Sequence, residues 1–165
     1  MKTRHVEDEL KHVGGKIIVE VIRDGKNGPE VIARRENHNL VVLTGKKQLL
    51  RLGSGLQAKF FDQMRIGTSP AAPTSGDTNV KSPIAGTLNT VPTAARSLND
   101  GRTHEWVISY PSGGGSISAN GIAEVCMLNE NTSPGGSALM RALITPTVNK
   151  TTLDKLKITY RLRVT

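Results

Sequence analysis

The stretch ANGIAEVCMLNE, residues 119–130, decides how this chain folds. Apart from Glu124, every side chain from Ile122 to Leu128 is apolar, at odd and even positions alike. A strand with one face in water alternates apolar and polar residues, whereas a strand covered on both faces reads as an unbroken apolar run. We therefore predict a strand between two layers. One layer is the domain core, and the other is either a second layer of this chain, such as a helix at 45–52, or a neighbouring subunit.

The lone carboxylate in this run has a counterpart further along the chain. If NTSP, residues 131–134, is the tip of a hairpin, symmetric pairing about it places Glu124 directly opposite Arg141. Arg141 is itself a lone charge between Leu139 and Leu143 on its strand face. Opposite charges on facing strands attract, and a slip of one residue would put them on opposite faces of the sheet. We predict a structural pair, Glu124 with Arg141, that fixes the register of these strands.

The rest of the sequence predicts more short strands and one short helix. LKITYRLRV, residues 156–164, alternates apolar with basic or polar side chains and is the clearest half-buried strand. Residues 14–37 indicate two strands around a turn. A helix is expected from the cap residue Thr44 to a stop at Gly53. Together these features predict an all-β fold, an antiparallel β-sandwich of jelly-roll or immunoglobulin-like type with one short α-helix.

The length of the chain, 165 residues, fits a single domain. We expect a polar N-terminal arm at 1–13 and one β-sandwich domain at 14–165. Residues 68–92 are rich in Pro, Ser, Thr and Gly and predict a long surface loop. The arm and this loop are suited to reaching a neighbour, so we expect a symmetric ring or trimer, or docking on a larger scaffold.

No segment has the residue spacing of a catalytic, cofactor or metal site. LTGKKQLL, residues 43–50, lacks the first glycine of a phosphate-binding loop and has Gln48 where Ser or Thr would hold magnesium. The four His are scattered singly, and Cys126 lies without a second sulfur in an apolar strand, as a core residue would. We therefore predict a protein that is not an enzyme and that binds no cofactor, metal or small-molecule substrate.

The formal net charge of +8 raises the expectation of an anionic partner. However, the basic residues are dispersed, and only 3% of the chain is aromatic, so a platform for stacking bases is poorly supported. Tyr160 is the aromatic residue closest to basic neighbours, and strand alternation puts it opposite to Arg161 and Arg163. We expect weak, non-specific binding to nucleic acid at most.

Four segments, in this order, resemble small structural proteins of tailed bacteriophage virions. In that group an N-L-V-x-x-x-G segment precedes a short helix, an I-G-T-x-x-x-x-P-x-x-x-D-T segment follows, and a strand with a central Glu leads through a lysine-containing link to a terminal alternating strand. The corresponding segments here are NHNLVVLTGKKQLLRL, MRIGTSPAAPTSGDTNV, ISANGIAEVCMLN and ALMRALITPTVNKTTLDKLKITYRLRV. The resemblance covers about residues 37–165.

The resemblance implies a non-enzymatic virion subunit, made in the host bacterial cytoplasm. Such a subunit assembles with copies of itself and with other virion proteins in a collar, tail, baseplate, fibre or capsid-decoration role, with no membrane partner. An alternative is a carbohydrate- or receptor-binding module of a fibre. Trp106 and Tyr110 would then be its candidate aromatics, although sharing a face with Ile108 favours their burial. A nucleic-acid-binding protein remains a third alternative, on charge alone.

Overall fold

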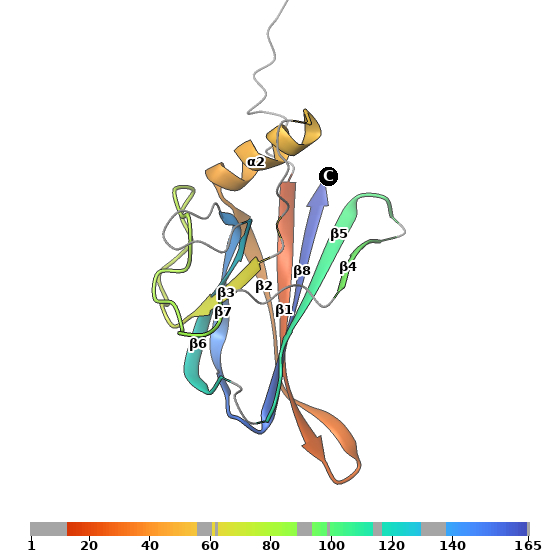
Figure 1. Ribbon diagram of the computed structural model, residues 1–165, viewed down its shortest axis with the longest axis vertical. Coiled ribbons are helices and arrows are strands. Elements are labelled where there is room, and N and C mark those ends of the chain that lie inside the picture. The colour runs from red at the N-terminus through yellow and green to blue at the C-terminus, as the bar shows by residue number, and fades with distance from the viewer. Residues whose placement is uncertain are drawn as a thin grey trace, which may run out of the picture.

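The structure of the protein is a computed structural model with β-strands throughout and one short helix, which confirms the all-β prediction (Figure 1). The arm at 1–12, the turn at 130–137 and the end of the long loop at 89–93 lie outside the described residues. The residues that the structure describes are 13–55, 61, 63–88, 94–98, 100–113, 117–129 and 138–164.

The described chain forms eight strands and one helix. In chain order they are β1 (Val13–Gly25), β2 (Gly28–Val41), α2 (Leu43–Gly53), β3 (Gln63–Gly67), β4 (Ala94–Ser97), β5 (Thr103–Tyr110), β6 (Ala119–Leu128), β7 (Ala138–Lys150) and β8 (Asp154–Val164).

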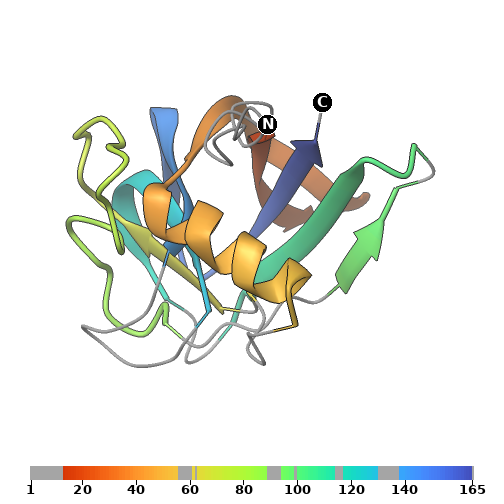
Figure 2. The same ribbon diagram turned by 90° about the horizontal axis from the view of Figure 1, so that it is seen from above.

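The strands form one sheet, which corrects the prediction of a two-sheet sandwich. The order is β3-β6-β7-β2-β1-β8-β5-β4, and each neighbouring pair is antiparallel. This sheet curls into a half-barrel, with α2 across one end (Figure 2). The sequence could not distinguish the two arrangements, because a curled sheet and a sandwich both cover one face of each strand.

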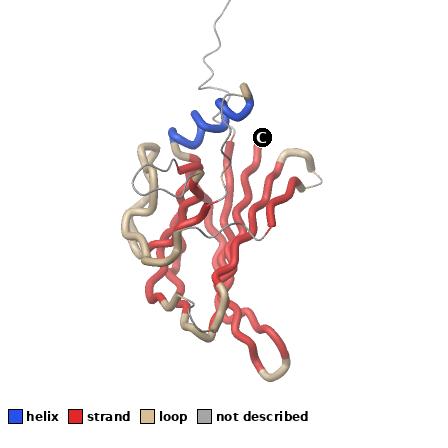
Figure 3. The backbone as a smooth tube through the Cα atoms, in the orientation of Figure 1, coloured by secondary structure: helices blue, strands red, loops and turns tan. Residues whose placement is uncertain are grey.

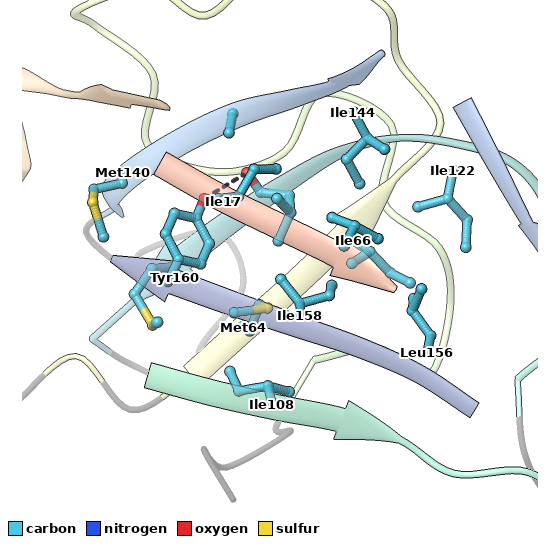
Figure 4. Packing of buried hydrophobic residues seen from close by; sticks show 14 of the residues in the cluster. Ile17, Met64, Ile66, Ile108, Ile122, Met140, Ile144, Leu156, Ile158 and Tyr160 are labelled. Carbon is cyan, nitrogen blue, oxygen red and sulfur yellow. Dashed lines mark hydrogen bonds between the residues drawn. The ribbon is translucent and has the colours of Figure 1, made fainter. Parts of the chain in front are cut away.

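The concave side of the curled sheet holds the main hydrophobic core (Figure 4). The hydroxyl of Tyr160 in β8 donates a hydrogen bond of 3.2 Å to the carbonyl of Val125 in β6, although three strands separate β8 from β6 in the sheet. Strands so distant in the order can meet only across the interior of a curled sheet. The β8 alternation is confirmed, because Leu156, Ile158 and Tyr160 are all fully buried here.

The two strands expected around a turn at 14–37 are β1 and β2, and their outer part leaves the body of the domain. β2 pairs with β7 only from Asn39 to Val41, whereas β1 stays paired with β8 as far as Arg23, so the part beyond Arg23 is a two-stranded hairpin. We call residues 22–32 the projecting hairpin (Figure 3). Its base is marked by a bulge, because Val21 pairs with Ala33 and the next pair skips one residue of β2.

The helix expected from Thr44 is present, but Thr44 is not its cap. The Thr44 hydroxyl instead donates to the carbonyl of Ala138 at 3.1 Å, and the first helical hydrogen bond is accepted by the carbonyl of Val42. A Cβ at Gly45 would overlap the backbone of Leu139 in β7. The glycine therefore lets α2 lie directly on the end of the sheet, where Leu49 packs against the main core.

Candidate functional site

Both faces of β6 are covered by this chain itself. Val125 lies in the main core, whereas Cys126 and Leu128 lie in a second, smaller cluster with Val80 of the long loop. The second layer is therefore the described part of that loop, residues 68–88. This confirms the alternative of a second layer of this chain, although the layer is the loop and not the helix at 45–52.

Arg141 of β7 lies fully buried under this loop, at the centre of a cluster of charges. Its Nε and Nη2 donate to Oε2 of Glu124 at 2.8 and 2.6 Å, and both side chains are 0% exposed. Its Nη1 donates to Oδ2 of Asp77 at 2.9 Å, and its Nη2 also donates to the carbonyl of Ala71 at 2.9 Å. One guanidinium thus contacts both the sheet and the loop. We call Asp77, Lys81, Glu124 and Arg141 the ion cluster.

The carboxylate of Glu124 also binds the loop backbone. It accepts hydrogen bonds from the amides of Ser69, Lys81 and Ser82, at 3.3, 3.0 and 2.8 Å. A Cβ at Gly67 would overlap the Glu124 carboxylate, so the glycine leaves room for the loop to turn around it. Three amide donors and one guanidinium therefore surround this buried carboxylate, as a buried charge requires.

Asp77 completes the cluster from the loop side. Burial by itself would raise the pKa of Asp77, but hydrogen bonds from Lys81 and Thr74 and the charge of Arg141 hold it well below its usual range. The amide and hydroxyl of Thr74 donate to its two oxygens at 2.9 and 2.8 Å, and Lys81 Nζ lies 2.7 Å from Oδ1. Two cations and two carboxylates make the ion cluster neutral overall.

The predicted pairing of Glu124 with Arg141 is present, but its register differs by two residues. Cys126, rather than Glu124, stands opposite Arg141, and Glu124 stands opposite Leu143. A shift of two keeps both charges on the same face, so the long side chains meet diagonally across the strand pair. A bulge between Met127 and Leu128 accounts for one residue of this shift, because Met127 stands opposite Met140 whereas Leu128 stands opposite Ala138.

The sequence did not point to Asp77 and Lys81 as members of this site. A signal was nevertheless available, because a guanidinium has five N–H donors and a single carboxylate cannot accept all of them. Asp77 is the one carboxylate in the sequence between Gln63 and Asn99, and it lies in a long loop that needs contacts with the rest of the domain. The spacing of Asp77 and Lys81, four residues apart, also brings their charges together.

The ion cluster is suited to holding structure rather than to chemistry. Each oxygen of the two carboxylates accepts at least one hydrogen bond or contacts a cation, and Arg141 donates to three different residues. A fully satisfied buried network specifies one arrangement of the groups around it. Cys126, beside the cluster, is buried, and burial raises the pKa of its thiol well above the ordinary range.

The aromatic side chains weighed for carbohydrate binding lie in or against the core. Tyr110 is 3% exposed, and its hydroxyl donates to the carbonyl of Thr87 at 3.4 Å. Trp106 is partly buried against the main core, with its ring next to that of His104. Their positions lend no support to a sugar-binding platform made from these two rings.

The hairpin of β1 and β2 and the helix α2 lie at the two ends of the long axis of the molecule (Figure 1), and both carry exposed large hydrophobic side chains. Val31 and Ile32 are 49% and 44% exposed on the projecting hairpin, and Leu153 lies in the turn beside its base. At the opposite end, Leu43 and Leu50 of α2 are 45% and 42% exposed. Leu40 of β2 is the other exposed large hydrophobic residue of the described chain, at 39%.

No family model, curated protein or solved structure matches the chain. Among the described residues, no helix is long and apolar enough to cross a membrane. In the same residues, no three His, Cys, Asp or Glu side chains gather as ligands of a metal ion would.

Proposed function

We propose that this protein is a non-enzymatic structural subunit of a bacteriophage virion, which acts by assembling with copies of itself and with neighbouring virion proteins. Two independent lines support the proposal. The sequence motifs at 37–165 resemble such proteins. The folded chain also presents apolar side chains on the hairpin and on α2, which lie at opposite ends of the molecule.

The projecting hairpin is the observation that carries the proposal. The hairpin extends beyond β7 with Val31 and Ile32 exposed, and beyond Arg23, where the pairing of β1 with β8 ends, its tip is two-stranded. Scattered exposed apolar residues are common, but adjacent ones on a projecting element are typical of surfaces that meet a partner. The long loop, which we expected to reach a neighbour, is instead held on its own sheet by the ion cluster. The hairpin takes over that role in the proposal.

Two measurements test this function. Sedimentation velocity of the purified protein over a wide concentration range should show self-association, and negative-stain images should show rings or stacked particles. Mass spectrometry of purified phage particles should detect the chain. A protein that stays monomeric at high concentration and is also missing from the particle is not a virion subunit of this kind.

A matched pair of variants connects the assembly to the hairpin. Val31→Ser with Ile32→Ser should weaken association, because both side chains are exposed and their replacement leaves the core unchanged. Val107→Thr in β5, on the outer face of the sheet, should leave association unchanged.

A further inference from the structure

The two apolar ends carry opposite charges that have no partner among the residues that the structure describes. Within the described part of the chain, every carboxylate except Asp24 and Glu30 has a side-chain hydrogen bond or ion pair. Both exceptions lie on the projecting hairpin, next to Val31 and Ile32. With Lys26 at the turn, the hairpin tip at 24–30 has a formal charge of −1, from two carboxylates and one lysine.

The bulge at the base of the hairpin exposes this apolar surface. Val21 pairs with Ala33 and Ile22 with Val31, so Ile32 is the extra residue with no counterpart on β1. A bulge redirects side chains and strengthens the local twist. As the extra residue, Ile32 does not follow the alternation of the strand, and its side chain is 44% exposed.

The exposed face of α2 has the complementary composition. Leu43, Lys47 and Leu50 follow each other at helical spacing on one side, and all three are exposed. Lys46 and Arg51 flank this stripe, and the helix has no acidic residue in its first turn. In the described chain, no carboxylate pairs with these three cations. The helix therefore presents leucines among charges of +3, from Lys46, Lys47 and Arg51.

We propose that the projecting hairpin of one copy binds the exposed face of α2 of the next copy, head to tail. The contact would place Val31 and Ile32 against Leu43 and Leu50, with the hairpin carboxylates near the helix cations. Pairing of two like ends is disfavoured, since it would bring the α2 cations together or the two carboxylates together. The inference rests on the proposed function and names the partner of its assembly surface.

The geometry of the contact determines what it builds. The hairpin and α2 lie at opposite ends of the long axis, so the contact joins two different surfaces (Figure 1). A repeated contact of this kind closes into a ring or continues as a stack of subunits. The hairpin is small beside the standard interface of about 1,600 Å² in total, so a single contact should be weak and should be reinforced when a ring closes.

A charge exchange between two variants tests the proposal. One variant, Asp24→Lys with Glu30→Lys, makes the hairpin basic, and the other, Lys47→Glu with Arg51→Glu, makes the α2 face acidic. Each variant alone should associate at least tenfold more weakly than the wild-type protein in sedimentation velocity at low salt. An equimolar mixture should associate again, because each basic hairpin meets an acidic helix and each remaining acidic hairpin meets an unaltered helix.

A control separates this contact from net charge. Arg102→Glu with Arg163→Glu changes the charge by the same amount beside the turn between β4 and β5, and should leave association unchanged. If the wild-type protein associates and the two charge variants do so equally well, or if the mixture does not recover, the head-to-tail contact is wrong while the proposed function stands. A wild-type protein that is monomeric throughout also overturns the contact, and its presence in phage particles then still supports the function.

Discussion

A buried arginine needs more hydrogen-bond acceptors than one carboxylate can supply. Arg141 has acceptors both on the neighbouring strand and on the long loop. Glu124 lies on the neighbouring strand, while Asp77 and the carbonyl of Ala71 come from the loop. A buried ion pair is weak support for stability by itself, because both ions lose their hydration. Removing one partner is different, because it leaves the other charge buried and unpaired.

This asymmetry gives a double-mutant prediction for Glu124 and Arg141. Glu124→Gln and Arg141→Met should each lower the free energy of unfolding by about 3–5 kcal/mol, whereas the double variant should lose clearly less than the sum. Urea unfolding of the three variants measures the coupling. As a control, Glu20→Gln and Lys157→Met break a partly exposed pair with a 3.1 Å contact and should couple by about 0–1 kcal/mol. Additive losses at Glu124 and Arg141 would contradict a structural pair.

Asp154 gives the protein an acid-sensitive contact at the base of the projecting hairpin. A hydrogen bond from Arg23, at 2.8 Å, and further ones from Thr151 lower its pKa to about 2. Because the pKa of the folded state lies below the unfolded value, the stabilisation is complete above about pH 4 and is lost as the pH falls towards 2. Arg23 is half exposed, and solvent screens the pair. The contact therefore contributes on the order of 1–2 kcal/mol to the free energy of unfolding.

The variant Asp154→Asn isolates this contribution. Its free energy of unfolding should be lower than that of the wild-type protein at pH 6 and should change less between pH 4 and pH 2. Urea unfolding at a series of pH values measures both curves. Equal acid dependence in the two proteins would show that Asp154 is not stabilised by its neighbours.

Among the elements, the long loop is the one that the ion cluster holds in place. Val80 and Leu88 of the loop pack over Cys126, and Asp77 anchors the loop to Arg141. The thiol can react only when the loop lifts or the domain unfolds, because it is fully buried. Its labelling rate therefore measures opening of the loop.

We expect Asp77→Asn to raise the labelling rate of Cys126 by a thiol reagent at least tenfold under native conditions. The substitution weakens the contacts with Arg141 and Lys81 and leaves the sheet unchanged. Asp154→Asn, the same chemical change at the opposite end of the domain, is the matched control and should raise the rate much less. Equal rates for the two variants would mean that global unfolding, not loop opening, exposes the thiol.

The sequence predicted most elements but not what covers them. Residues 14–37 and 156–164 carried local signals, alternation and turn residues, and became β1, β2 and β8. The loop over β6 carries no such periodicity, since it is held by Asp77 and by backbone amides. Long-range cover of this kind depends on which residues meet after folding, and local patterns do not report it.

The same limit applies to the register of β6 and β7. Charge pairing identified Glu124 and Arg141 as partners, because each is an isolated charge in an apolar strand. Symmetric counting from the turn placed them directly opposite each other, whereas the observed pairs are shifted by two residues, one of which comes from the bulge between Met127 and Leu128. A bulge has no reliable sequence signature. The sequence therefore predicted that the two side chains share a face of the sheet, but it did not predict which residues pair.

At the scale of the whole molecule, the curled sheet gives the chain two unlike ends. β2 pairs with β7 only from Asn39 to Val41, and β1 pairs with β8 only as far as Arg23. The hairpin therefore extends beyond the half-barrel at one end, while α2 covers the other (Figure 1). A sandwich with equal strands would expose loops at both ends. The early end of this pairing therefore creates the polarity on which the proposed head-to-tail contact depends.

The distribution of charge over the whole surface leads to a last prediction, about nucleic acid. The outer face of β2, β1, β8 and β5 gathers cations that are dispersed in the sequence, but carboxylates neutralise many of them. The shortest of these ion pairs are Lys16 with Glu36 at 2.6 Å, Arg161 with Glu105 at 2.7 Å and Lys157 with Glu20 at 3.1 Å. A phosphate backbone would have to displace these carboxylates from the cations, so each phosphate contact would add little binding free energy.

We therefore expect duplex DNA to bind with a dissociation constant of roughly 10⁻⁴–10⁻⁶ M at physiological salt and without preference between unrelated sequences. Fluorescence anisotropy with two labelled duplexes, at low and physiological salt, measures affinity and salt dependence together. Glu20→Gln with Glu36→Gln frees cations on the same face, so this variant should bind severalfold more tightly and with a steeper salt dependence. Nanomolar binding of one sequence by the wild-type protein would mean that the outer face reads nucleic acid, and that its carboxylates arrange the cations for that purpose instead of neutralising them.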